Sequence, residues 1–159
     1  MEYNQLDFEA FAEINPNIGI GVSSECNAIF RADLHTGYCE YLGFIPNEKM
    51  SQKRLYTKAL VCSGKIFLVP YSAGEIAVID AVSYEVEKLS IKTPLFNDNK
   101  YYEKRAKFNG GIIYGNSVYM IGCTYPGILK ISRVNDEYDV EYFAGWARGE
   151  SFILRKSPA

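Results

Sequence analysis

The strongest constraint on this chain is a pattern of four short strand-like runs within residues 54–91, each bounded by turn residues. Ser63 and Gly64 suit a tight reversal after the first run. The second and third runs are apolar and rich in β-branched residues, as in strands buried on both faces. The fourth alternates with period two, as in a half-exposed outer strand. The runs, at residues 55–62, 66–69, 76–79 and 84–91, predict a four-stranded antiparallel meander.

The same unit recurs before and after this stretch. A backward shift of 47 positions places Asp80 on Asp33, and a forward shift of 51 places Arg54 on Arg105. The forward offset grows to 54 at the end of the unit, which indicates small insertions in turns. We therefore expect one all-β domain over residues 1–159, built from three four-stranded meander repeats at about 6–42, 54–91 and 105–143.

Polar, lysine-rich connectors separate the repeats, at residues 43–53 and 92–104. The tail at residues 146–159 is interpreted as the possible start of a further unit. A basic cluster begins within the second connector and continues just past it, but acids and tyrosines lie nearby, so it is interpreted as a solvated loop. The cluster consists of Lys100, Lys104, Arg105 and Lys107.

Composition and charge exclude several classes of function. The net charge is −2 and the pI is about 5.5, so there is no basic surplus for nucleic acid. No apolar run is long enough to span a bilayer. Acidic residues stand near the N-terminus, where a secretory signal would carry basic ones. We expect a cytoplasmic protein that binds neither nucleic acid nor membrane.

The reactive side chains do not form a catalytic or metal-binding pattern. His35, the one histidine, lies in a glycine-containing turn and is interpreted as a surface residue. The four cysteines lack metal-ligand spacing, and Cys62 and Cys123 lie in apolar runs, where free cysteines act as small hydrophobic residues. We expect no catalytic residues, no metal and no cofactor, which favours a protein that is not an enzyme without excluding one.

Two stretches, KIFLVPYSAGEIAVIDAVSYEVEKL and SVYMIGCTYPGILKISRVNDEYDVEYF, resemble the blades of bacterial β-propeller repeat proteins. The meander repeats recur every 47 to about 54 residues, a length nearest to that of kelch-type blades. The kelch double glycine has only a faint counterpart, at Gly110 and Gly111, and the Trp-Asp dipeptide of WD-repeat blades is absent. The resemblance implies about three propeller blades and no named subfamily.

Three blades are too few to close a ring, since propellers typically have four to eight. The two terminal blades would each present a bare face that needs a partner. We therefore expect self-association into a dimer or larger ring, or a chain that is a fragment of a longer propeller. A closed barrel or sandwich is the alternative all-β fold.

The candidate binding site is at the mouth of the central channel, which the first strand of each blade lines in a propeller. Arg54 and Arg105 lie there, with Tyr56 and Lys104 beside them. Two guanidinium groups can bind a carboxylate, phosphate or acidic sugar through paired hydrogen bonds. The structural alternative, which we favour, is that each arginine bonds turn carbonyls or the neighbouring blade. Asp7 at the corresponding position of the first repeat weakens a symmetric arginine ring.

The predicted function is a non-catalytic scaffold that binds a protein or ligand through its connector loops and channel mouth. The connectors offer aromatic anchors at Phe44, Phe96, Tyr101 and Tyr102. The alternative is a propeller enzyme or lectin-like protein that holds an anionic glycan or other small anion with Arg54 and Arg105.

Overall fold

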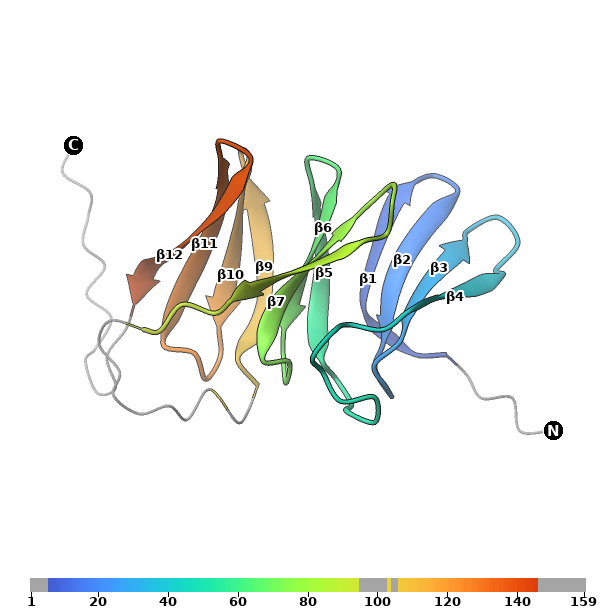
Figure 1. Cartoon of the computed structure of the whole chain (residues 1–159), viewed down its shortest axis with the longest axis horizontal. Coiled ribbons are helices and arrows are strands. Elements are labelled where there is room, and N and C mark those ends of the chain that lie inside the picture. The colour runs from blue at the N-terminus through green and yellow to red at the C-terminus, as the bar shows by residue number, and fades with distance from the viewer. Residues whose placement is uncertain (1–5, 95–102, 104–105, 146–159) are drawn as a thin grey trace.

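The computed structural model describes residues 6–94, 103 and 106–145 of the 159-residue chain. Within these residues, twelve β-strands form three four-stranded sheets (Figure 1). The first sheet contains β1 (Phe8–Asn15), β2 (Ile18–Ser23), β3 (Ile29–Asp33) and β4 (Cys39–Gly43). The second contains β5 (Tyr56–Cys62), β6 (Lys65–Pro70), β7 (Glu75–Asp80) and β8 (Val86–Ser90). The third contains β9 (Phe108–Tyr114), β10 (Ser117–Gly122), β11 (Gly127–Val134) and β12 (Glu137–Gly145).

Each sheet is an antiparallel meander in which the strands follow one another in sequence order. This confirms the predicted all-β fold of three four-stranded repeats, and we call the sheets blade 1, blade 2 and blade 3. The backbone of the turn between β5 and β6 explains why serine and glycine occupy it. Ser63 and Gly64 both have left-handed backbone angles (φ 50° and 73°), as a two-residue hairpin turn with the right-handed twist of its strands requires.

A shared turn between the third and fourth strands accounts for the repeat offset of 47. The Asp33 carboxylate accepts hydrogen bonds from the amides of His35 and Thr36, at 2.8 and 2.9 Å. In blade 2, Asp80 accepts in the same way from Val82 and Ser83. His35 is exposed in this turn. An aspartate therefore recurs because its side chain closes the turn.

The three blades stand side by side as a fan, with blade 2 between the other two (Figure 1). Their first strands are neighbours, because β1 contacts β5 and β5 contacts β9. This is the arrangement of a partial propeller, in which the first strand of each blade faces the central axis. No helix among the described residues is long and apolar enough to cross a membrane.

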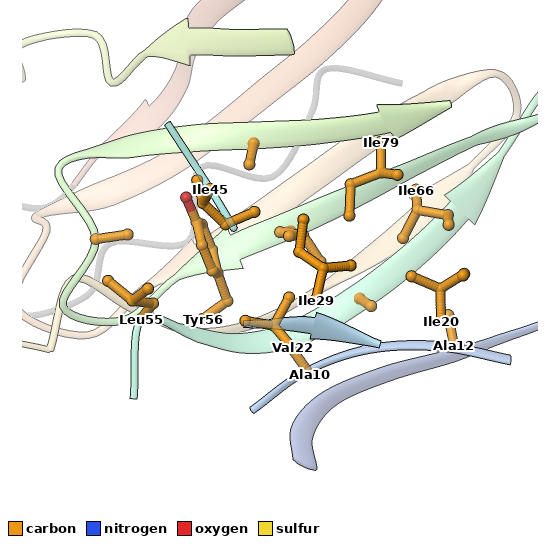
Figure 2. Close-up of a cluster of buried hydrophobic side chains, with 14 residues drawn as sticks. Ala10, Ala12, Ile20, Val22, Ile29, Ile45, Leu55, Tyr56, Ile66 and Ile79 are labelled. Carbon is orange, nitrogen blue, oxygen red and sulfur yellow. The ribbon is translucent and has the colours of Figure 1, made fainter. Parts of the chain in front are cut away.

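The hydrophobic core consists of two layers, one in each gap between blades. Between blades 1 and 2, Ile20 and Val22 pack in one layer with Ile66 (Figure 2), and Leu68 belongs to the same layer. The second layer, between blades 2 and 3, is made by side chains such as Phe67, Met120 and Leu129. Fully burying one such side chain contributes about 1.5–3 kcal/mol, so contact between blades supplies stability that an isolated meander lacks.

The outer strand of blade 2 divides its side chains between these two layers, as its alternation predicts. Val86 packs on the first layer and Leu89 on the second. The interpretation of Cys123 was wrong, because this residue follows β10 and is exposed, whereas Cys62 is buried as expected. The chain leaves β10 at a corner there, where the Cys123 amide donates to the Lys107 carbonyl instead of continuing the strand.

Candidate binding surfaces

Arg54 joins blade 2 to blade 1 at the start of β5. Its Nε lies 2.9 and 3.1 Å from the two carboxylate oxygens of Glu9, which belongs to β1. Its Nη1 donates to the Tyr71 hydroxyl, and the guanidinium carbon lies 4.1 Å from the centre of the Tyr71 ring. The hydrogen bonds to Glu9 raise the pKa of Arg54 above its ordinary value. This geometry matches the structural alternative, an arginine that fastens neighbouring blades.

The structure aligns the repeats differently from the sequence at this position. The amide of Ser24 donates to the Asp7 carbonyl, that of Ser72 to Arg54, and that of Thr124 to Ala106. The hydroxyls of Ser24, Ser72 and Thr124 repeat the same three contacts. The residues at equivalent positions are therefore Asp7, Arg54 and Ala106. The pairing of Arg54 with Arg105 by a shift of 51 was wrong by one residue, and arginine does not recur there.

The other predicted site residues divide into two groups. Tyr56 is buried in the layer between blades 1 and 2, where its hydroxyl donates to the Glu75 carbonyl at 3.2 Å. Burial raises the pKa of Tyr56. Phe44 is exposed on the first connector. The remaining residues lie outside the part of the chain that the structure describes: Phe96, Tyr101, Tyr102, Lys104 and Arg105.

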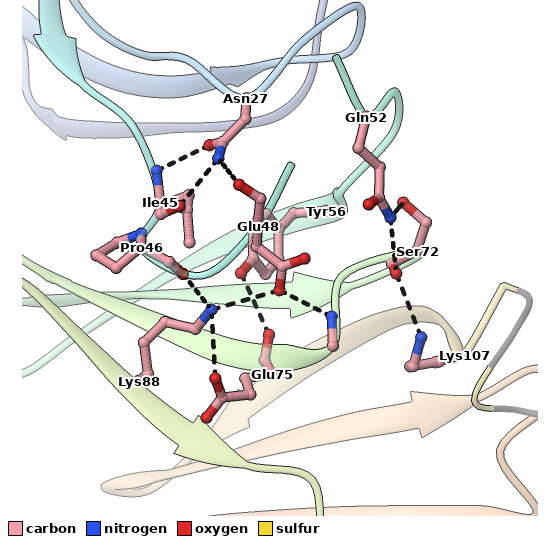
Figure 3. Close-up of polar contacts among 11 residues, drawn as sticks. Asn27, Ile45, Pro46, Glu48, Gln52, Tyr56, Ser72, Glu75, Lys88 and Lys107 are labelled. Carbon is pink, nitrogen blue, oxygen red and sulfur yellow. Dashed lines mark hydrogen bonds and ion pairs between the residues drawn. The ribbon is translucent and has the colours of Figure 1, made fainter. Parts of the chain in front are cut away.

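A buried polar cluster holds the first connector against blades 1 and 2 (Figure 3). The Asn27 side chain bonds both the amide and the carbonyl of Ile45, at 2.8 and 2.9 Å. Glu48 accepts from the Gly74 amide at 2.8 Å and from Lys88 Nζ at 3.3 Å. Lys88 also donates to the Pro46 carbonyl. The connector is therefore fixed in place and presents the exposed Phe44 from a rigid base.

Lys107 is buried with 2% of its surface exposed, so its assignment to a solvated loop was wrong. Its Nζ lies 3.4 Å from the Ser72 carbonyl (Figure 3) and 3.3 Å from the Glu103 carbonyl. Burial lowers the pKa of Lys107 below its ordinary value. The main-chain carbonyl of Lys107 accepts two amide hydrogen bonds from the corner that follows β10. The carbonyl of Leu55 accepts the corresponding two bonds in blade 2, so Lys107 and Leu55 occupy equivalent positions. The equivalence of Lys107 to an apolar residue in blade 2 was the feature of the sequence that could have indicated its burial.

The outer face of blade 3 carries side chains at the positions that, in blade 2, pack against the next blade. In blade 2, the cross-strand row of Leu60, Phe67 and Val78 packs toward blade 3. The equivalent row in blade 3 is Ile112, Tyr119 and Lys130. Ile112 is 57% exposed, and the exposed Phe143 lies against Tyr119, with 5.2 Å between ring centres.

The outer face of blade 1 is aromatic. Phe11, Gly21, Phe30 and Tyr41 form one cross-strand row. Phe30 and Tyr41 are in edge contact, with 5.7 Å between ring centres, and the Phe11 ring lies on Gly21 so closely that a Cβ there would meet it at 2.7 Å. Tyr41 is 54% exposed. Both ends of the fan therefore present apolar sheet faces.

The comparisons with known proteins agree with the fold. No protein-family model matches the chain, and no curated protein matches its sequence. A solved structure titled "Streptogramin B lyase structure", a β-propeller, resembles the chain with a TM-score of 0.61 at 10% sequence identity. The match covers 88% of this chain and 42% of that chain, so this chain spans less than half of the propeller's length. At this identity the likeness shows the fold alone.

Proposed function

We propose that this chain is a non-catalytic propeller-type binding scaffold that works as part of a ring completed by a second copy of itself. The observation that carries the proposal is the outer row of Ile112, Tyr119 and Lys130. It occupies the positions that pack against a neighbouring blade elsewhere in the same chain. A row of side chains that packs against a neighbouring blade elsewhere in the fold, but is exposed here, indicates an interaction surface.

The two terminal faces suit each other. Inside the chain, the row of Leu60, Phe67 and Val78 meets the blade 3 row that begins with Gly111 and Met120. The corresponding partner for the Ile112 row is the aromatic row of blade 1 from a second copy. Both rows are largely apolar, so the contact would bury hydrophobic side chains of each copy.

Such a contact joins two different faces of the chain. An assembly built from it forms a closed ring only when each chain uses both of its terminal faces. Two copies supply six blades, within the range in which propellers close. A solved propeller more than twice as long as this chain is consistent with that count. In this assembly the fixed first connector carries Phe44 and Met50, both exposed, as anchors for a protein or ligand. The engagement of Arg54 with Glu9 supports this scaffold over an arginine clamp for anionic glycans.

The solution mass tests the association. Light scattering on a sizing column should give a mass of at least two chains of 18.0 kDa each at micromolar concentration. Ile112→Glu places a charge on the terminal face and should yield the single-chain mass. Val82→Glu alters an exposed apolar residue in a turn away from either face and should leave the assembly intact. A folded wild-type protein that remains a monomer at high concentration contradicts the proposal.

A further inference from the structure

A crevice of about 390 Å³ lies between blades 2 and 3, near the hairpin turns of β5–β6 and β11–β12. This is the size of a site for a small organic molecule. Phe67, Ile131 and Tyr138 give it apolar walls. Lys65 and Arg133 bring two positive charges, and Asp136 brings one negative charge. The Phe67 and Tyr138 rings meet edge to face at 5.7 Å. The crevice therefore combines apolar walls with charged groups, of which two are cationic and one is anionic.

Tyr138 carries the one buried side-chain polar atom without a hydrogen-bond partner among the residues that the structure describes. A buried hydroxyl without a partner is costly, and it indicates a site where a group is missing. Burial also raises the pKa of Tyr138, so the hydroxyl keeps its proton at neutral pH and is a donor. A tyrosine hydroxyl can both donate and accept, so the proton of Tyr138 is available to a hydrogen-bond acceptor.

The orphan hydroxyl results from one change between the repeats. Tyr84 occupies the equivalent position in blade 2, since each tyrosine stands two residues before the valine that pairs with Ile79 or Ile131. The Tyr84 hydroxyl accepts a hydrogen bond from Arg31 of blade 1 at 3.2 Å. In blade 2, the position of Arg31 is taken by Val78, which cannot donate. The Tyr138 hydroxyl therefore lacks the donor that Arg31 provides for Tyr84.

The two cations retain capacity for a ligand. Lys65 Nζ lies 2.7 Å from Asp80, which leaves further N–H donors on the ammonium group. Arg133 is paired at 3.3 Å with Asp136, whose side chain is 95% exposed, so this ion pair is weak and easily exchanged. The guanidinium carbon lies 5.9 Å from the Tyr138 ring centre. The Arg133 guanidinium therefore lies beside the Tyr138 side chain at the crevice.

We propose that this crevice binds a small organic anion, with its apolar body against Phe67 and its carboxylate held by Tyr138, Lys65 and Arg133. Arg133 supplies paired donors, and Lys65 supplies charge at the side of the crevice. The site lies within one chain and is independent of the terminal faces, so it stands whether or not the ring forms.

Benzoate, with benzamide as its neutral counterpart, provides the probe. Titration followed by amide NMR spectra should show saturable shifts at Lys65, Phe67 and Tyr138 with benzoate, and at least tenfold weaker binding of benzamide. Tyr138→Phe should weaken benzoate binding by about tenfold or more, because a hydrogen bond to a charged acceptor is lost. This variant keeps the ring and removes only an unpaired hydroxyl, so it should fold.

Tyr84→Phe is the matched control, since it removes the equivalent hydroxyl from the other gap between blades, and it should bind benzoate as the wild type does. Arg133→Gln should also weaken binding by tenfold or more. Equal affinities for benzoate and benzamide would overturn the proposal, as would unchanged benzoate affinity in Tyr138→Phe, or shifts confined to other parts of the chain.

Discussion

Tyr138 lies in blade 3 where Tyr84 lies in blade 2, but only the Tyr84 hydroxyl has an arginine donor, Nε of Arg31 at 3.2 Å. The same side chain therefore has opposite consequences in two gaps of one fold. In the first gap the hydroxyl links two blades. In the second it is buried without a partner and borders a crevice.

This difference predicts opposite effects of one substitution. Tyr138→Phe should stabilise the protein by about 1 kcal/mol, because it removes a desolvated group that forms no hydrogen bond. Tyr84→Phe should destabilise it by about 1 kcal/mol, because it leaves Arg31 Nε without its acceptor. Urea unfolding of both variants and the wild type measures the two changes. Destabilisation of similar size in both would mean that the Tyr138 hydroxyl has a partner in solution.

The pair of Glu9 and Arg54 should couple blades 1 and 2 by a salt-sensitive interaction. Both side chains are substantially exposed, so their mutual attraction is screened as the salt concentration rises from about 0.05 to 1 M. A double-mutant cycle of Glu9→Ala and Arg54→Ala should give a favourable coupling energy at low salt that declines at high salt. Lys53→Ala removes a more exposed ion pair, with Glu25, and should have a smaller effect on stability. A coupling energy near zero at low salt would show that Arg54 does not fasten the blades.

Asp80 should contribute stability that is lost in acid. The hydrogen bond from Lys65 and the amides of Ser83 and Val82 hold its pKa well below the usual range. A folded-state pKa below the unfolded value of about 3.9 means that the stabilisation is fully present above about pH 5 and is lost as pH falls through the unfolded value toward the folded one. Asp80→Asn should therefore be less stable than the wild type at pH 7, and the difference should shrink below pH 4.

Asp33→Asn is the natural comparison for Asp80→Asn. Asp33 closes the equivalent turn, but Ile18 stands opposite it where Lys65 stands opposite Asp80. The loss of stability at pH 7 should be larger for Asp80→Asn, since only that variant loses an ion pair. Equal losses in unfolding experiments would mean that the lysine contributes nothing.

Lys107 should reduce stability at neutral pH, where it is charged and buried. Its folded-state pKa lies below the ordinary 10.5, so the unfolded chain binds more protons and stability rises as pH approaches 10.5. Lys107→Leu places the residue of the equivalent position in blade 2 and should be at least as stable as the wild type at pH 7. The alkaline rise should be absent from this variant and present in Lys49→Leu, an exposed control. A marked loss of stability in Lys107→Leu would show that its bonds to the Ser72 and Glu103 carbonyls outweigh the burial of charge.

The strands of this protein follow from local chemistry that the sequence displays. Ser63 and Gly64 turn the chain, Asp33 and Asp80 close equivalent turns with their own side chains, and each strand pairs with its neighbour in sequence. A strand that pairs with the next strand in the sequence has few other possible partners, so the number and order of the strands could be predicted. The alternation of Val86 and Leu89 also indicated correctly that they face different ways.

The sites depend on contacts between blades, which join residues about 50 positions apart. Small insertions in turns change the offset between the repeats, so their alignment from sequence was wrong by one residue. Arg105 was matched to Arg54, although Ala106 is the equivalent residue. Likewise, Lys107 reads as a solvated lysine until the corner before β9 buries it. The missing partner of Tyr138 follows from Val78 in the opposing sheet. Sequence alone determined the meanders, because hairpins form between adjacent residues; tertiary structure decided the sites, because opposing sheet faces determine which polar groups find partners.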